Sequence, residues 1–321
     1  MTRYDITTFG EPLLRLSVPA GERLETATRL DLFVGGAEIN TVCGLARLGR
    51  AAAWCGALPE GALGRRVAEH LRAAGVDTEP LIWREDGRLG TYYVEFAVPP
   101  RSTQVAYDRG GALVTELTED DLNWDRLLDT RAVYLTGITP ALSPSCRSLC
   151  AAIISRAKQE GIPICFDINY RARLWRASAA RSALMPLMQG ADLLFCSHRD
   201  AQTVFGLTGE PVECARQLRS QARARAVVMT LGEQGVLCLD GDTPLHQKAA
   251  PVTILDRIGA GDALAAGVID GWLAGNMRAA LQYGTVMAAL ALSQAGDSVI
   301  TTREEVERLV EAGDSSQLIH R

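Results

Sequence analysis

The fold of this chain is decided by one stretch near its C-terminus, which reads Leu255-Asp256-Arg257-Ile258-Gly259-Ala260-Gly261-Asp262. The stretch follows a run typical of a strand, residues 251–255, and opens an apolar segment with helical spacing, residues 263–273. Gly259, Ala260 and Gly261 have little or no side chain, so their backbone N–H groups can turn toward one point at a helix N-terminus. The sequence therefore predicts an anion-binding site at this junction.

Asp262 stands at the edge of the predicted anion site. A carboxylate beside an anion is electrostatically unfavourable unless it has a chemical task. The task that fits is to accept the proton of a hydroxyl that attacks a phosphoryl group. A glycine-rich turn with Asp262 as the helix N-cap explains the same residues when they are taken alone.

Composition narrows the classes of protein. The chain has 321 residues, 47% of them hydrophobic and 22% charged, which predicts one large α/β domain or one domain with a small appendage. A net charge of −5 argues against nucleic acid as a partner. Lys158 and Lys248 are the only two lysines, and neither lies in a Walker A loop.

Neither histidine nor cysteine spacing predicts a structural metal site, because the four histidines and eight cysteines form no ligand pattern. The N-terminus runs directly into a strand without a signal peptide, and no apolar run is long enough to span a bilayer. We therefore expect a reduced, cytoplasmic protein without a membrane partner.

Strand-like and helix-like segments alternate along most of the chain, which predicts parallel βαβ units. Two segments, residues 12–33 and 88–110, depart from the alternation and are rich in β-forming residues. We interpret them as a small β-sheet that acts as a lid inserted in a single domain, residues 1–321. An ordinary surface hairpin is the alternative.

Polar and glycine-rich clusters follow the predicted strands where each strand ends. Ligands of open parallel sheets bind outside the carboxyl ends of the strands, so clusters in register point to one site. The six clusters are Gly35-Gly36, Gly137, Asn169 to Arg171, Ser197, Thr230 to Gly235 and Gly259 to Asp262.

Two motifs now identify a family. Gly35-Gly36-Ala37-Glu38-Ile39-Asn40 resembles the N-terminal sugar-binding motif of the ribokinase-like (PfkB) carbohydrate kinases, and Asp256 to Asp262 resembles their C-terminal motif D-T-x-G-A-G-D, with Arg257 in place of threonine. The resemblance runs essentially end to end. It implies a ribokinase-like fold, a central and mostly parallel sheet flanked by helices, with a small β-sheet lid.

Further motifs are most similar to those of the 2-keto-3-deoxygluconate kinases. Phe166-Asp167-Ile168-Asn169-Tyr170-Arg171 and Leu174-Trp175 match their D-x-N-Y-R-x-x-L-W stretch, and Leu135 to Ser143 match their S-G-I-T-P-A-L-S stretch. Such kinases can carry Tyr-Tyr-Arg where this chain has Tyr107-Asp108-Arg109.

The resemblance implies a set of substrate-binding residues. A sugar acid carries a carboxylate that suits a guanidinium, and we expect Arg171 to matter more than Arg109 because a lid residue is more exposed. Asp297 is placed at the border of the site, although a helix C-cap turn explains it almost equally well. The predicted substrate-binding residues are Gly36, Asn40, Tyr92, Tyr107, Arg109, Ile138, Arg171, Asp262 and Asp297.

The resemblance also implies ATP and Mg²⁺ as cofactors, and a monovalent cation such as K⁺ is a further expectation. ATP is assigned to Ser197, to Thr230, Gly232 and Gly235 of a T-x-G-x-x-G loop, and to Gly259, Ala260 and Gly261. A plain hairpin turn is the alternative for the loop. Asp200 resembles the acidic residue of the family's N-x-x-E motif and is expected to hold magnesium through water.

The leading hypothesis is thus a kinase that transfers the γ-phosphate of ATP to a hydroxyl of 2-keto-3-deoxygluconate. The alternatives are a kinase of the same family for fructose, ribose or 5-dehydro-2-deoxygluconate, and a non-catalytic sugar or nucleotide sensor. A dinucleotide-dependent oxidoreductase needs G-x-G-x-x-G after the first strand, which Gly10-Glu11-Pro12 does not supply. Exposed β-edges of the lid suggest a homo-oligomer, with a dimer through the lid as the first expectation.

Overall fold

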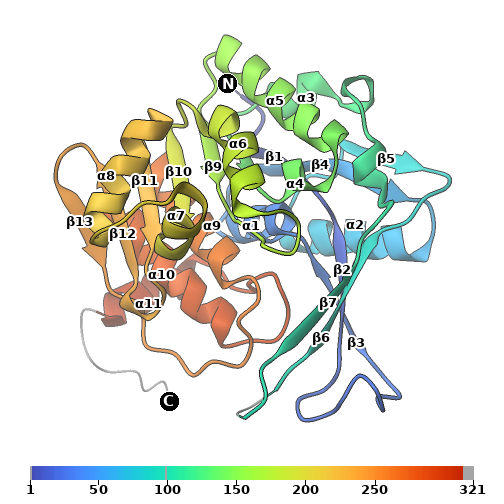
Figure 1. Cartoon of the computed structure of the whole chain (residues 1–321). Coiled ribbons are helices and arrows are strands. Elements are labelled where there is room, and N and C mark those ends of the chain that lie inside the picture. The colour runs from blue at the N-terminus through green and yellow to red at the C-terminus, as the bar shows by residue number, and fades with distance from the viewer. Residues whose placement is uncertain (1, 98–99, 314–321) are drawn as a thin grey trace.

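A computed structural model describes residues 2–97 and 100–313 of the chain. Within these residues a nine-stranded sheet forms the centre of the molecule (Figure 1). Its neighbouring strands pair in parallel except where β12 pairs with β11 and with β13. In spatial order the strands are β13 (Pro244–Gln247), β12 (Val236–Asp240), β11 (Ala226–Thr230), β10 (Leu193–Ser197), β9 (Ile164–Asp167), β8 (Val133–Thr136), β1 (Ile6–Phe9), β4 (Ala52–Pro59) and β5 (Leu81–Arg84).

One layer of helices covers the face of the sheet that is turned toward the viewer in Figure 1. These helices bury apolar side chains against one of two large cores. The layer consists of α3 (Trp124–Leu128), α5 (Pro144–Gln159), α6 (Ala177–Met188), α7 (His198–Phe205) and α8 (Pro211–Ala222), and the short helix α4 (Thr139–Leu142) precedes α5.

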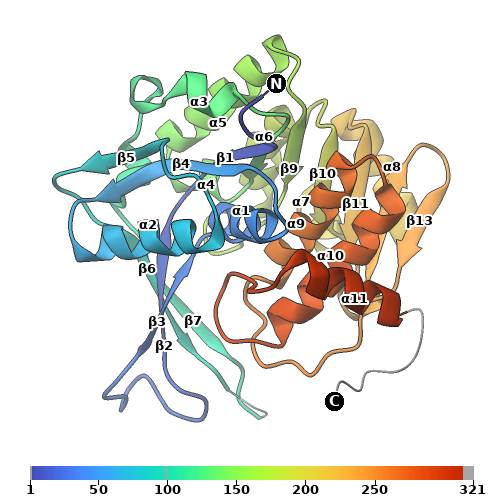
Figure 2. The ribbon, with the colours of Figure 1, turned by 180° about the vertical axis from the view of Figure 1, so that it is seen from behind.

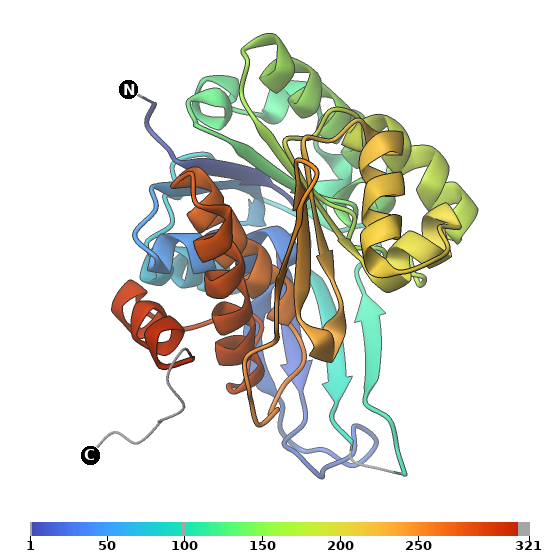
Figure 3. The ribbon, with the colours of Figure 1, turned by 90° about the vertical axis from the view of Figure 1, so that its left-hand side faces the viewer.

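A second layer covers the opposite face, which Figure 2 shows from behind and Figure 3 shows edge-on. It consists of α1 (Ala37–Arg47), α2 (Ala62–Ala74), α9 (Ala260–Leu273), α10 (Met277–Leu292) and α11 (Arg303–Gly313). Successive residues of a strand point to opposite faces, so Tyr134 and Leu135 of β8 belong to different cores. The predicted α/β class, a mostly parallel sheet flanked by helices, is confirmed.

A separate four-stranded sheet projects from the body (Figures 1 and 2). Its order is β3 (Asp31–Gly35), β2 (Leu13–Ser17), β6 (Gly90–Glu95) and β7 (Gln104–Asp108), with β2 and β6 parallel and the other pairs antiparallel. We call it the small sheet. Its strands come from the two segments that the sequence sets apart, and its closure as a lid stays a prediction.

One local expectation is wrong, and one strand was missed. Residues 251–255 are not a strand: Leu255 and Asp256 instead donate their backbone N–H groups to the carbonyl of Leu292, at 2.8 and 3.3 Å. Strand β5 was not expected, because only four half-exposed residues after a proline give little periodicity. None of the helices in the described ranges is long and apolar enough to cross a bilayer.

Candidate active site

A cavity of about 700 Å³ lies at the carboxyl edge of the central sheet, between the start of α9 and the inner face of the small sheet. Most of the predicted residues line it. These are Gly36, Asn40, Tyr92, Tyr107, Arg109, Ile138, Arg171, Ser197, Asp200, Thr230, Gly259, Gly261, Asp262 and Asp297. Ala260, Gly232 and Gly235 are not among the lining residues. One cavity therefore collects groups that the sequence holds up to 261 positions apart.

The predicted anion site lies at the first turn of α9. Gly259 is the N-cap with a φ of 82°, a left-handed conformation that favours glycine. A Cβ on Gly259 would lie 1.8 Å from the carbonyl oxygen of Asp297, so the space excludes any side chain. The first N–H groups of an α-helix have no partner within the helix, and Gly259, Gly261 and Asp262 line the cavity. Because Gly259 is the N-cap, the alternative in which Asp262 caps the helix is wrong.

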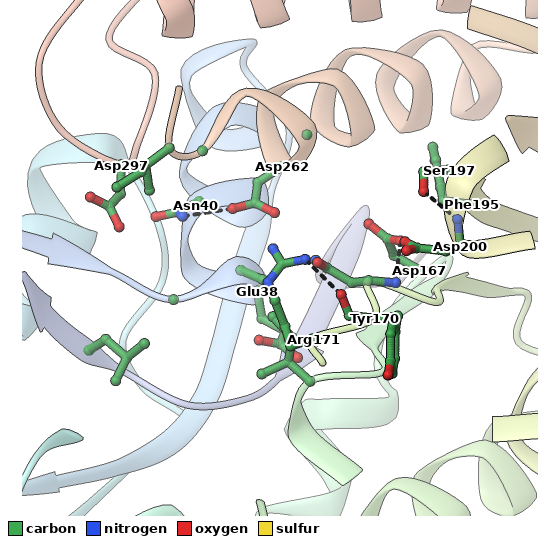
Figure 4. A pocket seen from close by; sticks show the side chains of 18 of the residues that line it. Glu38, Asn40, Asp167, Tyr170, Arg171, Phe195, Ser197, Asp200, Asp262 and Asp297 are labelled. Atoms are coloured by element: carbon green, nitrogen blue, oxygen red, sulfur yellow. Dashed lines mark hydrogen bonds between the residues drawn. The ribbon is translucent and has the colours of Figure 1, made fainter. Parts of the chain in front are cut away.

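Asp262 lies in that first turn and is 8% exposed. Asn40, at the start of α1, donates its side-chain N–H to Oδ2 of Asp262 at 2.8 Å (Figure 4). Ser298 donates its hydroxyl to Oδ1 of Asn40 at 3.0 Å and so fixes which way the amide points. Burial raises the pKa of Asp262 to about 7, while Asn40 and the charge of Arg171 act in the opposite direction. A carboxylate with a pKa near neutrality is suited to accept a proton.

Gly36 brings α1 close to the cavity. Its φ is 129°, and a Cβ there would lie 2.3 Å from the carbonyl oxygen of Glu11. The next turn of α1 carries Glu38, whose Oε1 accepts the hydroxyls of Thr136 and Thr139, each at 2.7 Å. Gly36 is therefore needed for the close approach of two backbones, and its contact with a sugar stays a prediction.

The two candidate arginines differ in exposure, and the order is the reverse of the expected one. Arg109 is the buried one: its side chain is 12% exposed and makes an ion pair with Glu11, through both Nε and Nη2. Burial, and then the charge of Arg171, lower the pKa of Arg109 to about 10. Arg171 is exposed, and its Nη1 donates to the carbonyl of Tyr170 at 3.3 Å. Among the described residues no carboxylate lies within ion-pair distance of Arg171, so its charge is available to a ligand in the cavity (Figure 4).

The two tyrosines of the small sheet stack on each other, with ring centroids 5.4 Å apart. The hydroxyl of Tyr92 donates to Oδ2 of Asp297, whereas Tyr107 is 41% exposed. Burial raises the pKa of Asp297 to about 6, against the effect of Arg15 and Tyr92. Tyr92 and Asp297 are thus part of one buried network, and Tyr107 is the tyrosine that remains open to a ligand.

Asp108 does not place its charge in the cavity. Its carboxylate makes an ion pair with Arg88 at 2.9 Å on the exposed side of β7. Ile138 lies after β8 and contributes an apolar part of the cavity wall. The acidic substitution next to Arg109 is therefore neutralised by a surface arginine, and Glu11 is the residue that pairs with Arg109.

The predicted nucleotide residues separate into two groups. Ser197 and Thr230 are the last residues of β10 and β11, and both line the cavity. Gly232 and Gly235 form the turn between β11 and β12, and a Cβ on Gly235 would lie 2.1 Å from the carbonyl oxygen of Gln247. A hairpin turn thus accounts for these two glycines, and their contact with ATP stays a prediction. Ser197 caps α7 by accepting the N–H of Asp200 at 2.9 Å.

Asp200 and Asp167 are the acidic residues on this side of the cavity. Burial, and then the neighbouring Asp262, raise the pKa of Asp167 to about 8, and burial also raises the pKa of Asp200. No group of three or more metal-ligating side chains occurs within residues 2–97 and 100–313. Asp200 and Asp167 are carboxylates of the kind that can hold magnesium through water, and this role stays a prediction.

A second cavity of about 1090 Å³ lies beyond the anion site, between residues 246–255 and helices α10 and α11. Its walls include the apolar residues Leu255, Val286, Ala289, Leu290 and Leu309. Leu255 belongs to this cavity, and Ile258 and Gly259 belong to the first. The anion site thus lies where the two cavities approach each other.

Several residues that line the cavity were not among the predicted site residues. Glu11, Glu38 and Asp167 line the cavity as acidic groups, and Arg257 lines it in place of the threonine of the motif. Glu11 follows β1 and Asp167 ends β9, so the rule that ligands meet the carboxyl ends of strands points to both. Arg15 is different: an arginine inside a strand gives no signal that it is buried.

Comparison with known proteins agrees with this geometry. Residues 5–303 match the model of the pfkB family of carbohydrate kinases. The chain is 40% identical to a 2-dehydro-3-deoxygalactonokinase of Haloferax volcanii over 97% of this chain and 98% of the relative, and 29% identical to a 2-dehydro-3-deoxygluconokinase of Thermoproteus tenax over 96% and 94%. A solved 2-dehydro-3-deoxygluconokinase of Thermotoga maritima superposes with a TM-score of 0.90 at 30% identity, over 95% of this chain and 98% of that one.

The chain belongs to the PfkB family of carbohydrate kinases. It is accordingly an ATP-dependent kinase whose acceptor is a carbohydrate hydroxyl.

Proposed function

We propose that this kinase phosphorylates a 2-keto-3-deoxy sugar acid, with 2-keto-3-deoxygluconate as the acceptor. The observation that carries the proposal is the unpaired guanidinium of Arg171, which lines the same cavity as Asp262. A guanidinium that makes no ion pair with a carboxylate of the described residues favours a ligand that brings its own carboxylate. The 2-dehydro-3-deoxygluconokinases among the relatives support the same class of acceptor.

In the proposed mechanism Arg171 binds the acceptor carboxylate and Tyr107 flanks the sugar chain. Asp262 accepts the proton of the acceptor hydroxyl as that oxygen attacks the γ-phosphorus, while the bond from the γ-phosphorus to the β,γ-bridging oxygen breaks and ADP leaves. The N–H groups of Gly259 to Asp262 stabilise the charge on the transferring phosphoryl group. Asp200 and Asp167 would hold magnesium through water, and the ion would supply neutralisation of the charge on the ATP phosphates. We assign the nucleoside of ATP to the second cavity, which is apolar and adjoins the anion site.

A second acceptor is 2-keto-3-deoxygalactonate, because the relative at 40% identity is a 2-dehydro-3-deoxygalactonokinase. This acid differs from the gluconate compound only in configuration at C4. The carboxylate contact to Arg171 is common to both, so it selects the class of acid and leaves the epimer to the rest of the cavity.

The deciding experiment is a coupled ATP-consumption assay with both 2-keto-3-deoxy acids, 5-dehydro-2-deoxygluconate, fructose and ribose. We expect kcat/KM to be highest for one of the 2-keto-3-deoxy acids, with the gluconate compound first. A higher value for the galactonate compound would change the epimer alone. A preference for fructose or ribose would refute the sugar-acid assignment, and no turnover of any acceptor would favour a sensor.

The same chain is proposed to form a dimer through the small sheet. Its outer strands β3 and β7 leave backbone groups unpaired at both edges. Light scattering at micromolar concentration tests this, and a monomer would refute it.

A further inference from the structure

Arg15, on β2 of the small sheet, is a fully buried cation beside the anion site. Its side chain is 1% exposed. Nη2 lies 2.6 Å from Oδ2 of Asp256, and Nη1 lies 3.0 Å from Oδ1 of Asp297. The rings of Phe33 and Phe96 each lie 5.0 Å from the guanidinium carbon. Two carboxylates and two aromatic rings therefore hold this charge in one place.

Both carboxylates that Arg15 joins support the anion site from behind. Asp256 begins the loop that leads to α9, and its Oδ1 accepts the N–H of Ile258 at 3.0 Å. Its Oδ2 accepts the N–H of Gly296 at 3.2 Å. The carbonyl of Asp297 packs against Gly259, where even a Cβ would not fit. Arg15 thus fixes both sides of the turn that positions the N–H groups of the anion site.

The same contacts bear on the monovalent cation that the family resemblance implies. Such an ion needs several oxygen ligands that are free to coordinate it. Each of the four carboxylate oxygens of Asp256 and Asp297 already accepts a hydrogen bond, from Arg15, Ile258, Gly296 or Tyr92. These carboxylates therefore do not fit a bound K⁺, because a guanidinium already occupies the position where a cation would neutralise them.

We propose that Arg15 is the resident cation of the anion site: it positions the Asp256–Asp262 loop and makes phosphoryl transfer independent of an added monovalent cation. It is a positioning residue, since its side chain contacts Asp256 and Asp297 and is not among the residues that line the cavity. The small sheet, which contributes Tyr92 and Tyr107 to the acceptor side, also contributes this support to the phosphoryl side.

The first test uses the unmodified enzyme. Initial rates with saturating ATP, magnesium and the best acceptor are compared in KCl and in tetramethylammonium chloride at equal ionic strength. We expect equal rates in the two salts, whichever acceptor the enzyme prefers. Several-fold activation by K⁺ would overturn the proposal. Because the result is a ratio of rates, it is separate from the identity of the acceptor.

The second test replaces the guanidinium. Arg15→Met should lower kcat on the order of 100-fold, the scale expected when reacting groups are misplaced by about 1 Å, while KM for the acceptor stays within about threefold. Arg15→Lys keeps the charge but cannot bridge both carboxylates. Its kcat should therefore lie between that of the wild type and that of Arg15→Met. The matched control is Arg23→Met, which removes an arginine paired with Glu95 of the small sheet at 2.9 Å, away from the anion site.

The double variant Arg15→Met, Asp256→Asn distinguishes the proposed positioning role of Arg15 from a contribution to stability alone. Neutralising Asp256 removes a buried charge that Arg15→Met leaves without its partner, so the melting temperature should recover. We expect kcat to stay low, because the loop still lacks its bridge to the small sheet. Wild-type kcat in the double variant, or in a folded Arg15→Met, would overturn the proposal.

Discussion

The central sheet and the small sheet bury different kinds of side chain. Strands of the central sheet, such as Val133–Thr136 and Leu193–Ser197, are mostly apolar on both faces, and the reactive groups follow their carboxyl ends. The small sheet buries Arg15 and Tyr92 on the face that meets the cavity. In the first sheet the strands are scaffold and the loops carry the chemistry, whereas in the second the strands themselves carry it.

The difference follows from what each sheet packs against. Helices cover both faces of the central sheet, so charged side chains within its strands would lose hydration without gaining partners. The small sheet has a minor apolar core of Leu13, Tyr92 and Val94 and faces two carboxylates, Asp256 and Asp297. A buried guanidinium is tolerated there because each of its charged contacts is satisfied.

The largest expected effect lies on the side of the central sheet, at Asp262. Asp262→Asn keeps the size of the side chain and removes the proton acceptor, so kcat should fall by about 10²–10⁴-fold, with ATP affinity largely retained. Steady-state kinetics with the best acceptor and ATP titration by calorimetry measure the two quantities. Asp108→Asn, on the exposed side of β7, is the control carboxyl-to-amide change and should keep wild-type kcat. Near-normal turnover by Asp262→Asn would refute the assigned base.

The next effect compares the two arginines of the cavity. Charge-assisted hydrogen bonds contribute about 1.5–3 kcal/mol, so Arg171→Ala should lower kcat/KM for the sugar acid by roughly 10- to 150-fold and barely change it for a neutral sugar. Arg181→Ala, an exposed change on α6, is the control. Equal losses of kcat/KM on acidic and neutral acceptors would refute the contact between Arg171 and an acceptor carboxylate.

Arg109→Ala should lower activity for a different reason from Arg171→Ala. It leaves the carboxylate of Glu11 buried without its partner, facing the acceptor. We expect a loss on the acid that Glu11→Gln relieves when it is added to Arg109→Ala. If the double variant is no better than the single one, Arg109 itself binds the acceptor.

A smaller effect concerns pH. Burial raises the pKa of Asp262 to about 7, and a base must be ionised to accept a proton. The value of kcat/KM should therefore fall about tenfold per pH unit below about 7 and level off above it. Asn40→Ala removes the hydrogen bond that lowers this pKa, so the acidic limb should move to higher pH. A profile that is flat from pH 5 to 8 would contradict the raised pKa.

The smallest effect is expected in backbone protection. If the small sheet closes as a lid, hydrogen exchange at Gly90–Glu95 and Gln104–Asp108 should slow by a few-fold when the acceptor binds. The buried strand Leu193–Ser197 is the internal control and should not change. Unchanged exchange in the small sheet would show that it is a fixed wall.

Much of the architecture follows from local sequence patterns. Alternating strand-like and helix-like segments predict the parallel sheet, and Gly259 to Gly261 predict a helix start without side chains in the way. The polar clusters after each strand predict a site at the carboxyl edge, because parallel strands end on the same side. These inferences hold because each depends on residues that are neighbours in the chain.

Contacts between distant residues were decided by the tertiary structure. Arg15 meets Asp297 across 282 positions, and Arg109 meets Glu11 across 98. The sequence by itself identified Arg109 and Arg171 as candidates for the site. The expectation that Arg109 is the more exposed of the two is wrong. Only the fold decided that Arg109 is paired and Arg171 is open, and that Arg15 is buried against two carboxylates. The physical reason is that periodicity and backbone preference act over a few residues, whereas charge pairing depends on which strands and loops the topology brings together.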